Sequence, residues 1–180
     1  LTHDGRTYMH WAANRGNVAV LEYLSSKGGK ATVTDSHGST PLNFAAGAGQ
    51  QNTKIYDICL ASGANLKNDV NNDGANALLL AISNDNGLKL TDYFVAKGLS
   101  LNSTDAAGNN AFAYAAKAGN IEMLKTLLKK GIKADPNSMI MASVGSRRAA
   151  NTLDVYQFLE SLNIKPATSK ENVLHALVRK

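Results

Sequence analysis

The sequence predicts an all-α solenoid of stacked antiparallel helix pairs joined by short hairpin-like turns. The first observation behind this prediction is a glycine period. Gly28, Gly63, Gly98 and Gly131 each follow an apolar helical pattern at intervals of 33 to 35 residues, and Asn163 takes the next such place. Glycine and asparagine commonly end helices because they adopt positive φ at little cost. Self-similarity at a period of about 33 residues is typical of repeats that bury their apolar faces against their neighbours.

The second observation concerns the helix before each of these caps. The residues four and eight positions before every cap are apolar, and this spacing places them on one face of a helix. The pattern therefore predicts one buried stripe on each of five successive helices. Its members are Leu24, Cys59, Phe94, Leu127 and Leu159, with Val20, Ile55, Leu90, Met123 and Val155 one turn earlier.

The third observation is a further short helix before each of these. Thr7, Thr40, Asn76 and Asn110 are residue types that cap helix N-termini, and Pro41 stands at a first helical position, where no N–H is needed. Aspartate and glycine before these caps are typical of tight turns. A column of small residues predicts that neighbouring backbones approach closely: Ala12, Ala45, Ala81, Ala115 and Ala142.

Two connections depart from this pattern. No Asp-x-x-Gly turn tip follows Gly131, so a short capped turn is expected there. The link at 146–151 is longer than its counterparts, and it is either one added turn of helix or an exposed basic loop. A capping box from Thr168 to Glu171 opens a final helix. Helices are expected near 8–15, 18–27, 41–48, 53–62, 77–84, 88–97, 111–118, 121–130, 138–147, 152–161 and 170–179.

This repeating unit resembles the ankyrin repeat. The ankyrin motif reads Asp-x-x-Gly-x-Thr-Pro-Leu-His-x-Ala-Ala, followed by a second helix that ends in Leu-Leu shortly before a glycine. Thr40 to Leu42 matches the first part, and Leu127 to Gly131 matches the second. The resemblance implies one ankyrin-repeat domain over 1–180, and the ends of the chain indicate a fragment of a longer protein. The expected repeats are 2–34, 35–70, 71–104, 105–137 and 138–167, with a partial repeat at 168–180.

Composition excludes several classes of protein. Hydrophobic residues make up 44% and charged residues 18%, which is ordinary for a globular chain, and no apolar run approaches the length of a transmembrane segment. The single cysteine excludes an internal disulfide and a multi-cysteine metal site. Residues 1–90 hold seven basic and seven acidic residues, whereas residues 91–180 hold twelve and seven, so the excess of +5 lies in the second half. The cellular location stays open.

Few residues suggest chemistry of their own. His10 stands at the histidine of the ankyrin motif, which implies a structural hydrogen bond, and Cys59 belongs to the buried stripe. His3 and His37 lie beside turn glycines and are expected at solvent-facing turn tips, although two neighbouring imidazoles could also hold a metal. No catalytic group, cofactor or metal site is predicted. An aromatic-rich column is assigned to core packing rather than to a ligand groove: Trp11, Phe44, Leu80 and Tyr114.

The resemblance implies a non-catalytic scaffold that binds a partner protein on its concave surface. Its partner is expected to be acidic or mixed in charge, and its uncapped ends are expected to self-associate. Two alternatives are an acidic polymer, such as nucleic acid or an anionic surface, bound by the basic half, and a regulatory module of a larger enzyme. Nucleic acid is disfavoured because few aromatic residues interleave with the basic ones. The expected contacts are His3, Asp4, Arg6, Asn14, Arg15, Ser36, His37, Ser39, Asn72, Asp73, Ala75, Ser83, Asn84, Ala106, Asn109 and Lys117, with Arg147 and Arg148 in the long link.

Overall fold

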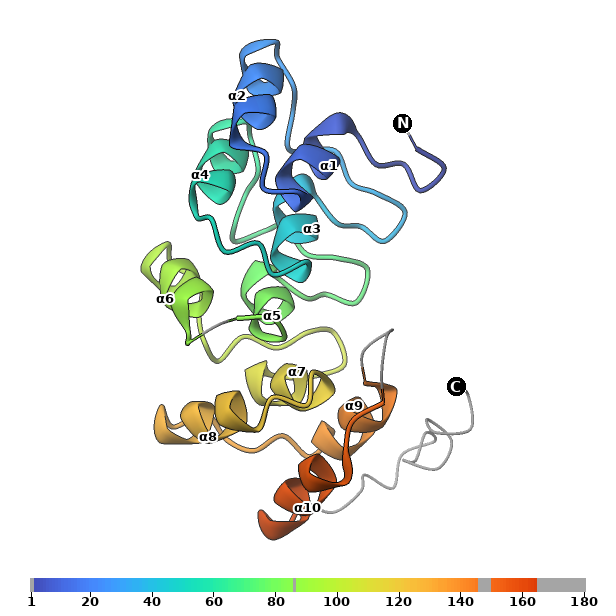
Figure 1. The fold of residues 1–180 in the computed structure, drawn as a ribbon, viewed down its shortest axis with the longest axis vertical. Coiled ribbons are helices and arrows are strands. Elements are labelled where there is room, and N and C mark those ends of the chain that lie inside the picture. The colour runs from blue at the N-terminus through green and yellow to red at the C-terminus, as the bar shows by residue number, and fades with distance from the viewer. Residues whose placement is uncertain (1, 86, 146–149, 165–180) are drawn as a thin grey trace. The chain divides into compact units, whose positions relative to one another are not determined.

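A computed structural model describes residues 2–85, 87–145 and 150–164 of the chain. Within these ranges the chain forms ten short α-helices and no strand (Figure 1). The ankyrin-type helix-pair fold predicted from the sequence is confirmed. The chain divides into two compact units, residues 1–107 and 108–180. The helix predicted at 170–179 and the partial repeat at 168–180 lie outside the described residues.

The first unit holds three helix pairs. The first helices of the pairs, here called inner helices, pack in a row with α3 between α1 and α5, and each inner helix packs on the helix that follows it. Figure 1 shows the inner helices on the side from which the long turns project, and α2, α4 and α6 on the side away from these turns. The helices are α1 (Tyr8–Asn14), α2 (Val18–Ser26), α3 (Pro41–Gly47), α4 (Lys54–Ala61), α5 (Ala77–Ile82) and α6 (Lys89–Ala96).

The second unit holds two further pairs. Its inner helices, α7 and α9, pack on each other, while α7 also packs on α8 and α9 on α10. The helices are α7 (Ala111–Lys117), α8 (Ile121–Lys129), α9 (Ser138–Val144) and α10 (Leu153–Ser161). None of the described helices exceeds nine residues, so none is long enough to cross a membrane.

Side chains cap the inner helices as predicted. The side-chain oxygens of Thr7, Thr40, Asn76 and Asn110 each accept a hydrogen bond from a backbone N–H in the first helical turn. Helix α6 begins differently, because the buried Asp85 carboxylate accepts the N–H groups of its second and third residues at 3.0 and 2.8 Å. At the other ends, the predicted left-handed caps are confirmed. The φ values are +81° at Gly28, +102° at Gly63, +99° at Gly98, +81° at Gly131 and +55° at Asn163.

The predicted buried stripe forms the core in every repeat but the first. Eight of its ten residues are buried, from Ile55 and Cys59 to Val155 and Leu159. Val20 is 42% exposed and Leu24 is only half-buried, which corrects the prediction for α2. In α2 the fully buried residue is Leu21, and Val20 and Leu24 lie in the first described repeat, which has a neighbouring repeat on one side only.

The long turns of the first unit, called fingers below, form a backbone ladder across repeats. The carbonyl oxygen of Asp4 accepts the N–H of Ser36 at 2.9 Å, and that of His37 accepts the N–H of Asn72 at 2.8 Å. A third rung joins the Asp73 carbonyl to the N–H of Ala106 at 2.9 Å. Main-chain atoms alone make these rungs, so they hold the fingers in register whatever side chains the fingertips carry.

The short turn predicted after Gly131 is also confirmed. Helix α9 begins at Ser138, three residues beyond Asp135, and no finger intervenes. The buried Asp135 carboxylate accepts the N–H of Asn110 at 2.9 Å and the N–H of Asn137 at 2.8 Å. A carboxylate thus joins the start of α7 to the turn that leads into α9, where finger backbones form the links between earlier repeats.

Amide side chains form a second set of links, at the opposite ends of the inner helices. In each, an amide nitrogen donates to a main-chain oxygen at the end of the preceding inner helix, and a glycine with positive φ lies beside it. A Cβ on that glycine would lie 2.3–2.5 Å from an atom of the amide residue. The links are Gln50 to Asn14 at 3.4 Å beside Gly16, Asn84 to Gly47 at 3.1 Å beside Gly49, and Asn151 to Ala116 at 3.0 Å beside Gly119.

Candidate protein-interaction surface

Each inner helix leaves one stripe of residues open to solvent. In α3 the residues around the stripe are buried, while Phe44 is half-buried and Gly47 and Ala48 are exposed. This i, i+3, i+4 pattern is the face of the helix that packs against no neighbour. The same positions recur in α1 and α5. We call the resulting surface of the first unit the inner stripe: Trp11, Asn14, Arg15, Phe44, Gly47, Ala48, Leu80, Ser83 and Asn84.

The inner stripe corrects the assignment of the aromatic-rich column to the core. Trp11, Phe44 and Leu80 are half-buried, and only Tyr114 in the second unit, 6% exposed, is a core residue. Apolar character alone was misleading here. The useful signal lay three and four positions later, where residues such as Asn14 and Arg15 are polar and share the same helical face.

Two aromatic rings meet in the inner stripe. The Trp11 and Phe44 ring centres are 5.6 Å apart with planes at 89°, an edge-to-face arrangement. The Arg6 guanidinium lies 4.4 Å from the Phe44 ring centre, as in a cation–π contact. Because Trp11 meets Phe44 edge-on and the Arg6 guanidinium covers the Phe44 ring, these rings form no parallel platform for stacking successive bases of a nucleic acid.

Carboxylates on both sides hold Arg6 in this place. Its Nη1 lies 2.8 Å from an oxygen of the half-exposed Asp4, and its Nε lies 2.9 Å from an oxygen of the buried Asp35. Burial alone would raise the pKa of Asp35. Hydrogen bonds from the N–H groups of Ser39 and His37, together with the Arg6 guanidinium, nevertheless hold that pKa below its usual range. Arg6 therefore joins the first two repeats, with its charge balanced inside the protein.

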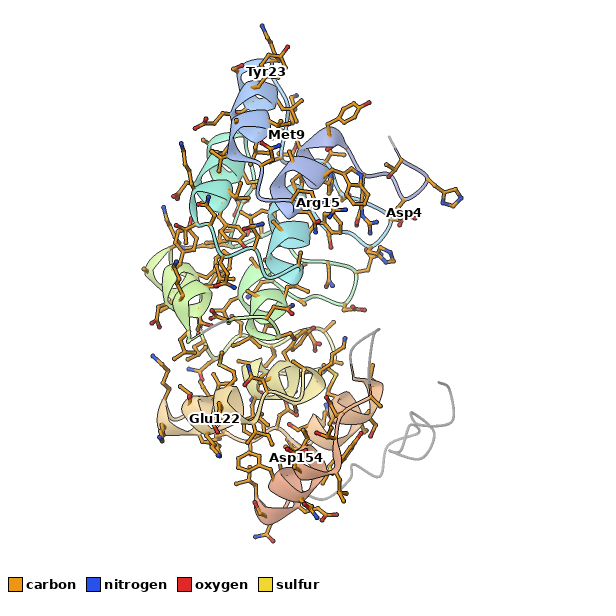
Figure 2. The ribbon with its side chains drawn as sticks, viewed as in Figure 1. Asp4, Met9, Arg15, Tyr23, Glu122 and Asp154 are labelled. Atoms are coloured by element: carbon orange, nitrogen blue, oxygen red, sulfur yellow. The ribbon has the colours of Figure 1, made fainter. Side chains whose placement is uncertain are left out.

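Most of the expected fingertip contacts are exposed. His3, Ser36, His37, Asn72, Asp73 and Ala106 lie at the surface, and Figure 2 shows Asp4 at the projecting first finger. Three expected contacts are corrected, because they are buried. Ser39 is 9% exposed and its carbonyl oxygen accepts His10 Nε2 at 2.9 Å, Ala75 has no exposed surface, and Asn109 is 8% exposed beside the amide of Asn137.

The expected contacts on the inner helices share one face. Asn14, Arg15, Ser83 and Asn84 belong to the inner stripe, and Lys117 holds the corresponding place in α7 of the second unit. Figure 2 shows Arg15 at the end of α1. Arg147 and Arg148 lie outside the described residues.

Several charged residues of the second helices are paired with one another. Lys54 Nζ lies 2.7 Å from Glu22, and Lys97 Nζ lies 2.7 Å from Asp57, so these pairs link successive outer helices. The Tyr93 hydroxyl donates to the same Asp57 carboxylate at 2.8 Å. In the second unit, Lys125 pairs with Glu122 along α8 at 2.9 Å, and Figure 2 labels Glu122 on that helix.

The two groups that sequence reasoning weighed as reactive are buried. Burial raises the pKa of the Cys59 thiol to about 12, so the thiol stays protonated at neutral pH. Burial likewise lowers the pKa of His10, whose Nδ1 accepts the Thr7 N–H at 3.1 Å. Within the described ranges, no group of three or more His, Cys, Asp or Glu side chains is arranged to hold a metal ion.

A family model described as ankyrin repeats (3 copies) matches residues 1–67 and 52–140. The chain belongs to the ankyrin repeat family. Ankyrin repeats are generally non-catalytic modules for protein–protein interaction, and the inner helices and fingers described above are their characteristic elements.

Several much longer proteins contain a similar segment. Potassium channel AKT2/3 of Arabidopsis thaliana is 31% identical over 121 residues, which is 67% of this chain and 14% of the channel. Phosphocholine transferase AnkX of Legionella pneumophila is 26% identical over 176 residues, 97% of this chain and 18% of the transferase. Neurogenic locus notch homolog protein 1 of Mus musculus is 28% identical over 131 residues, 73% of this chain and 5% of that protein. The chain thus spans less than a fifth of these relatives.

Proposed function

We propose that this ankyrin-repeat chain is a scaffold that binds a partner protein on its concave surface, through the inner stripe and the exposed fingertips. One observation carries the proposal: the inner helices of three successive repeats share one stripe in which polar residues lie beside the half-buried Trp11, Phe44 and Leu80. The outer charges Glu22 and Asp57 are paired with lysines of neighbouring helices, whereas Arg15 in the stripe is exposed. Exposed apolar surface beside polar groups favours protein binding.

Rigidity of the frame supports the same proposal. The finger ladder, made by main-chain atoms, and the amide links, made by the Gln50 and Asn84 side chains, fix successive repeats. The contact side chains are therefore held in place before a partner arrives. A preorganised surface loses less conformational entropy on binding. The proposed contacts are His3, Asp4, Arg6, Asn14, Arg15, Ser36, His37, Asn72, Asp73, Ser83, Asn84, Ala106 and Lys117, with Arg147 and Arg148 in the long link.

A photo-crosslinking experiment tests this function. A benzophenone amino acid is placed at the exposed Ala48 on the inner stripe or at Ser36 on a fingertip, and the control places it at the outer residue Glu22. Each protein is irradiated in an extract of cells that express the chain, and the crosslinked proteins are identified by mass spectrometry. We expect the Ala48 and Ser36 variants to capture the same discrete protein, absent from the Glu22 control. Capture mainly through Glu22 would contradict the proposal.

A second candidate is a regulatory ankyrin module within a larger enzyme. It is favoured by the similarity of almost the whole chain to a segment of a protein named phosphocholine transferase, although that activity belongs to the relative. The complete coding sequence tests it. A catalytic domain beside the repeats supports the regulatory role, whereas a coding sequence of repeats alone opposes it.

A further inference from the structure

Charge is scarce on the partner-facing surface of the first unit. Arg15 is the single charged residue of the inner stripe, whose other members are apolar, small or neutral polar. Among the fingertips of this unit, Asp73 is exposed, while Asp4 is neutralised by Arg6 at 2.8 Å. Arg6 is itself shared with Asp35. The two arginines and three aspartates named here sum to a charge of −1, so the surface has no net positive charge with which to attract an acidic segment.

The middle of the inner stripe is its most apolar part. Phe44 is half-buried there, followed by the exposed Gly47 and Ala48, which carry no long side chain. Trp11 and Leu80 stand in the repeats on either side. The guanidinium of Arg6 lies over Phe44 and is paired with two carboxylates, so it adds no net positive charge to the stripe.

We propose that the inner stripe of the first unit binds an uncharged segment of the partner protein through apolar side chains seated on Gly47 and Ala48, beside Trp11 and Phe44. This inference rests on the proposed function and specifies its partner. Burial of apolar side chains against this floor supplies the affinity, since the centres of protein interfaces are depleted of charge. The neutral rim of Asn14, Ser83 and Asn84 provides hydrogen bonds. For the first unit, this replaces the acidic complement expected from the sequence.

The chain contains a reporter at the right place. Trp11 is the only tryptophan, and it lies half-buried in the inner stripe. An apolar segment seated beside it lowers the polarity around the indole and shifts its emission to shorter wavelength. Binding elsewhere on the chain leaves this emission unchanged.

Three synthetic peptide pools of about 12 residues per peptide serve as probes. All share the same Leu, Phe and Tyr positions, and the intervening residues are Ser and Asn in the neutral pool, Glu in the acidic pool and Lys in the basic pool. Each is titrated into the chain while Trp11 emission is recorded, at about 50 and about 500 mM NaCl. We expect only the neutral pool to bind with a blue shift, and its Kd to change less than about twofold with salt, because no ion pairs are screened.

A matched pair of variants locates the binding. Ala48→Asp places a charge in the middle of the stripe, and Ala61→Asp places one at the end of outer helix α4 in the same repeat; both alanines are exposed. We expect Ala48→Asp to weaken binding of the neutral pool by about tenfold or more, and Ala61→Asp to leave it within about twofold.

Three results would overturn the inference: absence of binding by the neutral pool, equal losses in the two variants, or binding by the acidic pool that weakens steeply with salt. The last result leaves the proposed function standing, since the surface would bind protein through another chemistry. Failure of the proposed function itself shows separately, as crosslinking through Glu22.

Discussion

Replacement of Gly49 by alanine should destabilise the protein far more than replacement of Gly28, although both glycines have left-handed backbones. Their φ values are +72° and +81°. An L side chain in this region costs about 1–2 kcal/mol at either site. A Cβ on Gly28 would meet nothing within 4 Å, so replacement of Gly28 carries only this backbone cost. A Cβ on Gly49 would lie 2.4 Å from the Cβ of Asn84, far inside van der Waals contact, and Asn84 must move.

Movement of Asn84 would weaken two hydrogen bonds between repeats. Its Nδ2 donates to the Gly47 carbonyl at 3.1 Å, and its own carbonyl accepts Gln51 Nε2 at 3.2 Å. Each such hydrogen bond contributes a net of about 1 kcal/mol. We therefore expect a loss of about 3–4 kcal/mol for Gly49→Ala, against about 1–2 kcal/mol for Gly28→Ala.

Urea unfolding, followed in parallel by far-ultraviolet circular dichroism and Trp11 fluorescence, measures both losses. The double variant Gly49→Ala/Asn84→Gly adds a sharper check, because it removes the Cβ that collides. Its loss should be smaller than the sum of the two single losses by about 1 kcal/mol. Equal losses for Gly49→Ala and Gly28→Ala, or strict additivity in the double variant, would refute the reasoning.

Three further predictions concern buried groups. Cys59→Ala should cost about 1–3 kcal/mol in urea unfolding, and a thiol reagent should label native Cys59 only as fast as the protein opens. Since burial lowers the pKa of His10, its contribution to stability should be complete above about pH 6.5 and be lost as pH falls through its lower folded-state pKa; His10→Gln should flatten this part of the stability profile. Asp35→Asn should cost about 2–3 kcal/mol because it leaves Arg6 half-paired, whereas Asp4→Asn at the exposed end of the same network should cost under about 1 kcal/mol in the same assay.

Local chemistry explains why the helices could be predicted from the sequence. Thr7 and Thr40 cap their helices through atoms three residues away, and Gly63 ends one through its own backbone freedom. The unusual start of α6 was not predictable, because Asp85 caps it across a turn in which Leu88 adopts φ +67°. No propensity rule assigns a leucine to that conformation.

The contacts between repeats were less accessible to sequence reasoning. Gln50 and Asn84 donate to main-chain oxygens more than thirty residues away. Any residue type has a main-chain carbonyl oxygen, so the sequence does not mark which one accepts. The inner stripe was misjudged for a different reason. Trp11 and Phe44 are apolar enough for a core, and only the packing of whole helices shows that one side of each remains open.

The finger ladder has a consequence for how this protein can change over evolutionary time. Ser36 and Ala106 enter it through their N–H groups alone, whereas the Asn72 side chain also donates to the Ser36 carbonyl oxygen at 3.0 Å. Substitution of such a residue by any amino acid except proline preserves the rung, since proline alone lacks the donor. The fingertips can therefore accumulate mutations that alter what they recognise while the free energy of folding stays nearly constant. New specificities can arise here by single steps, without a compensating mutation elsewhere in the chain.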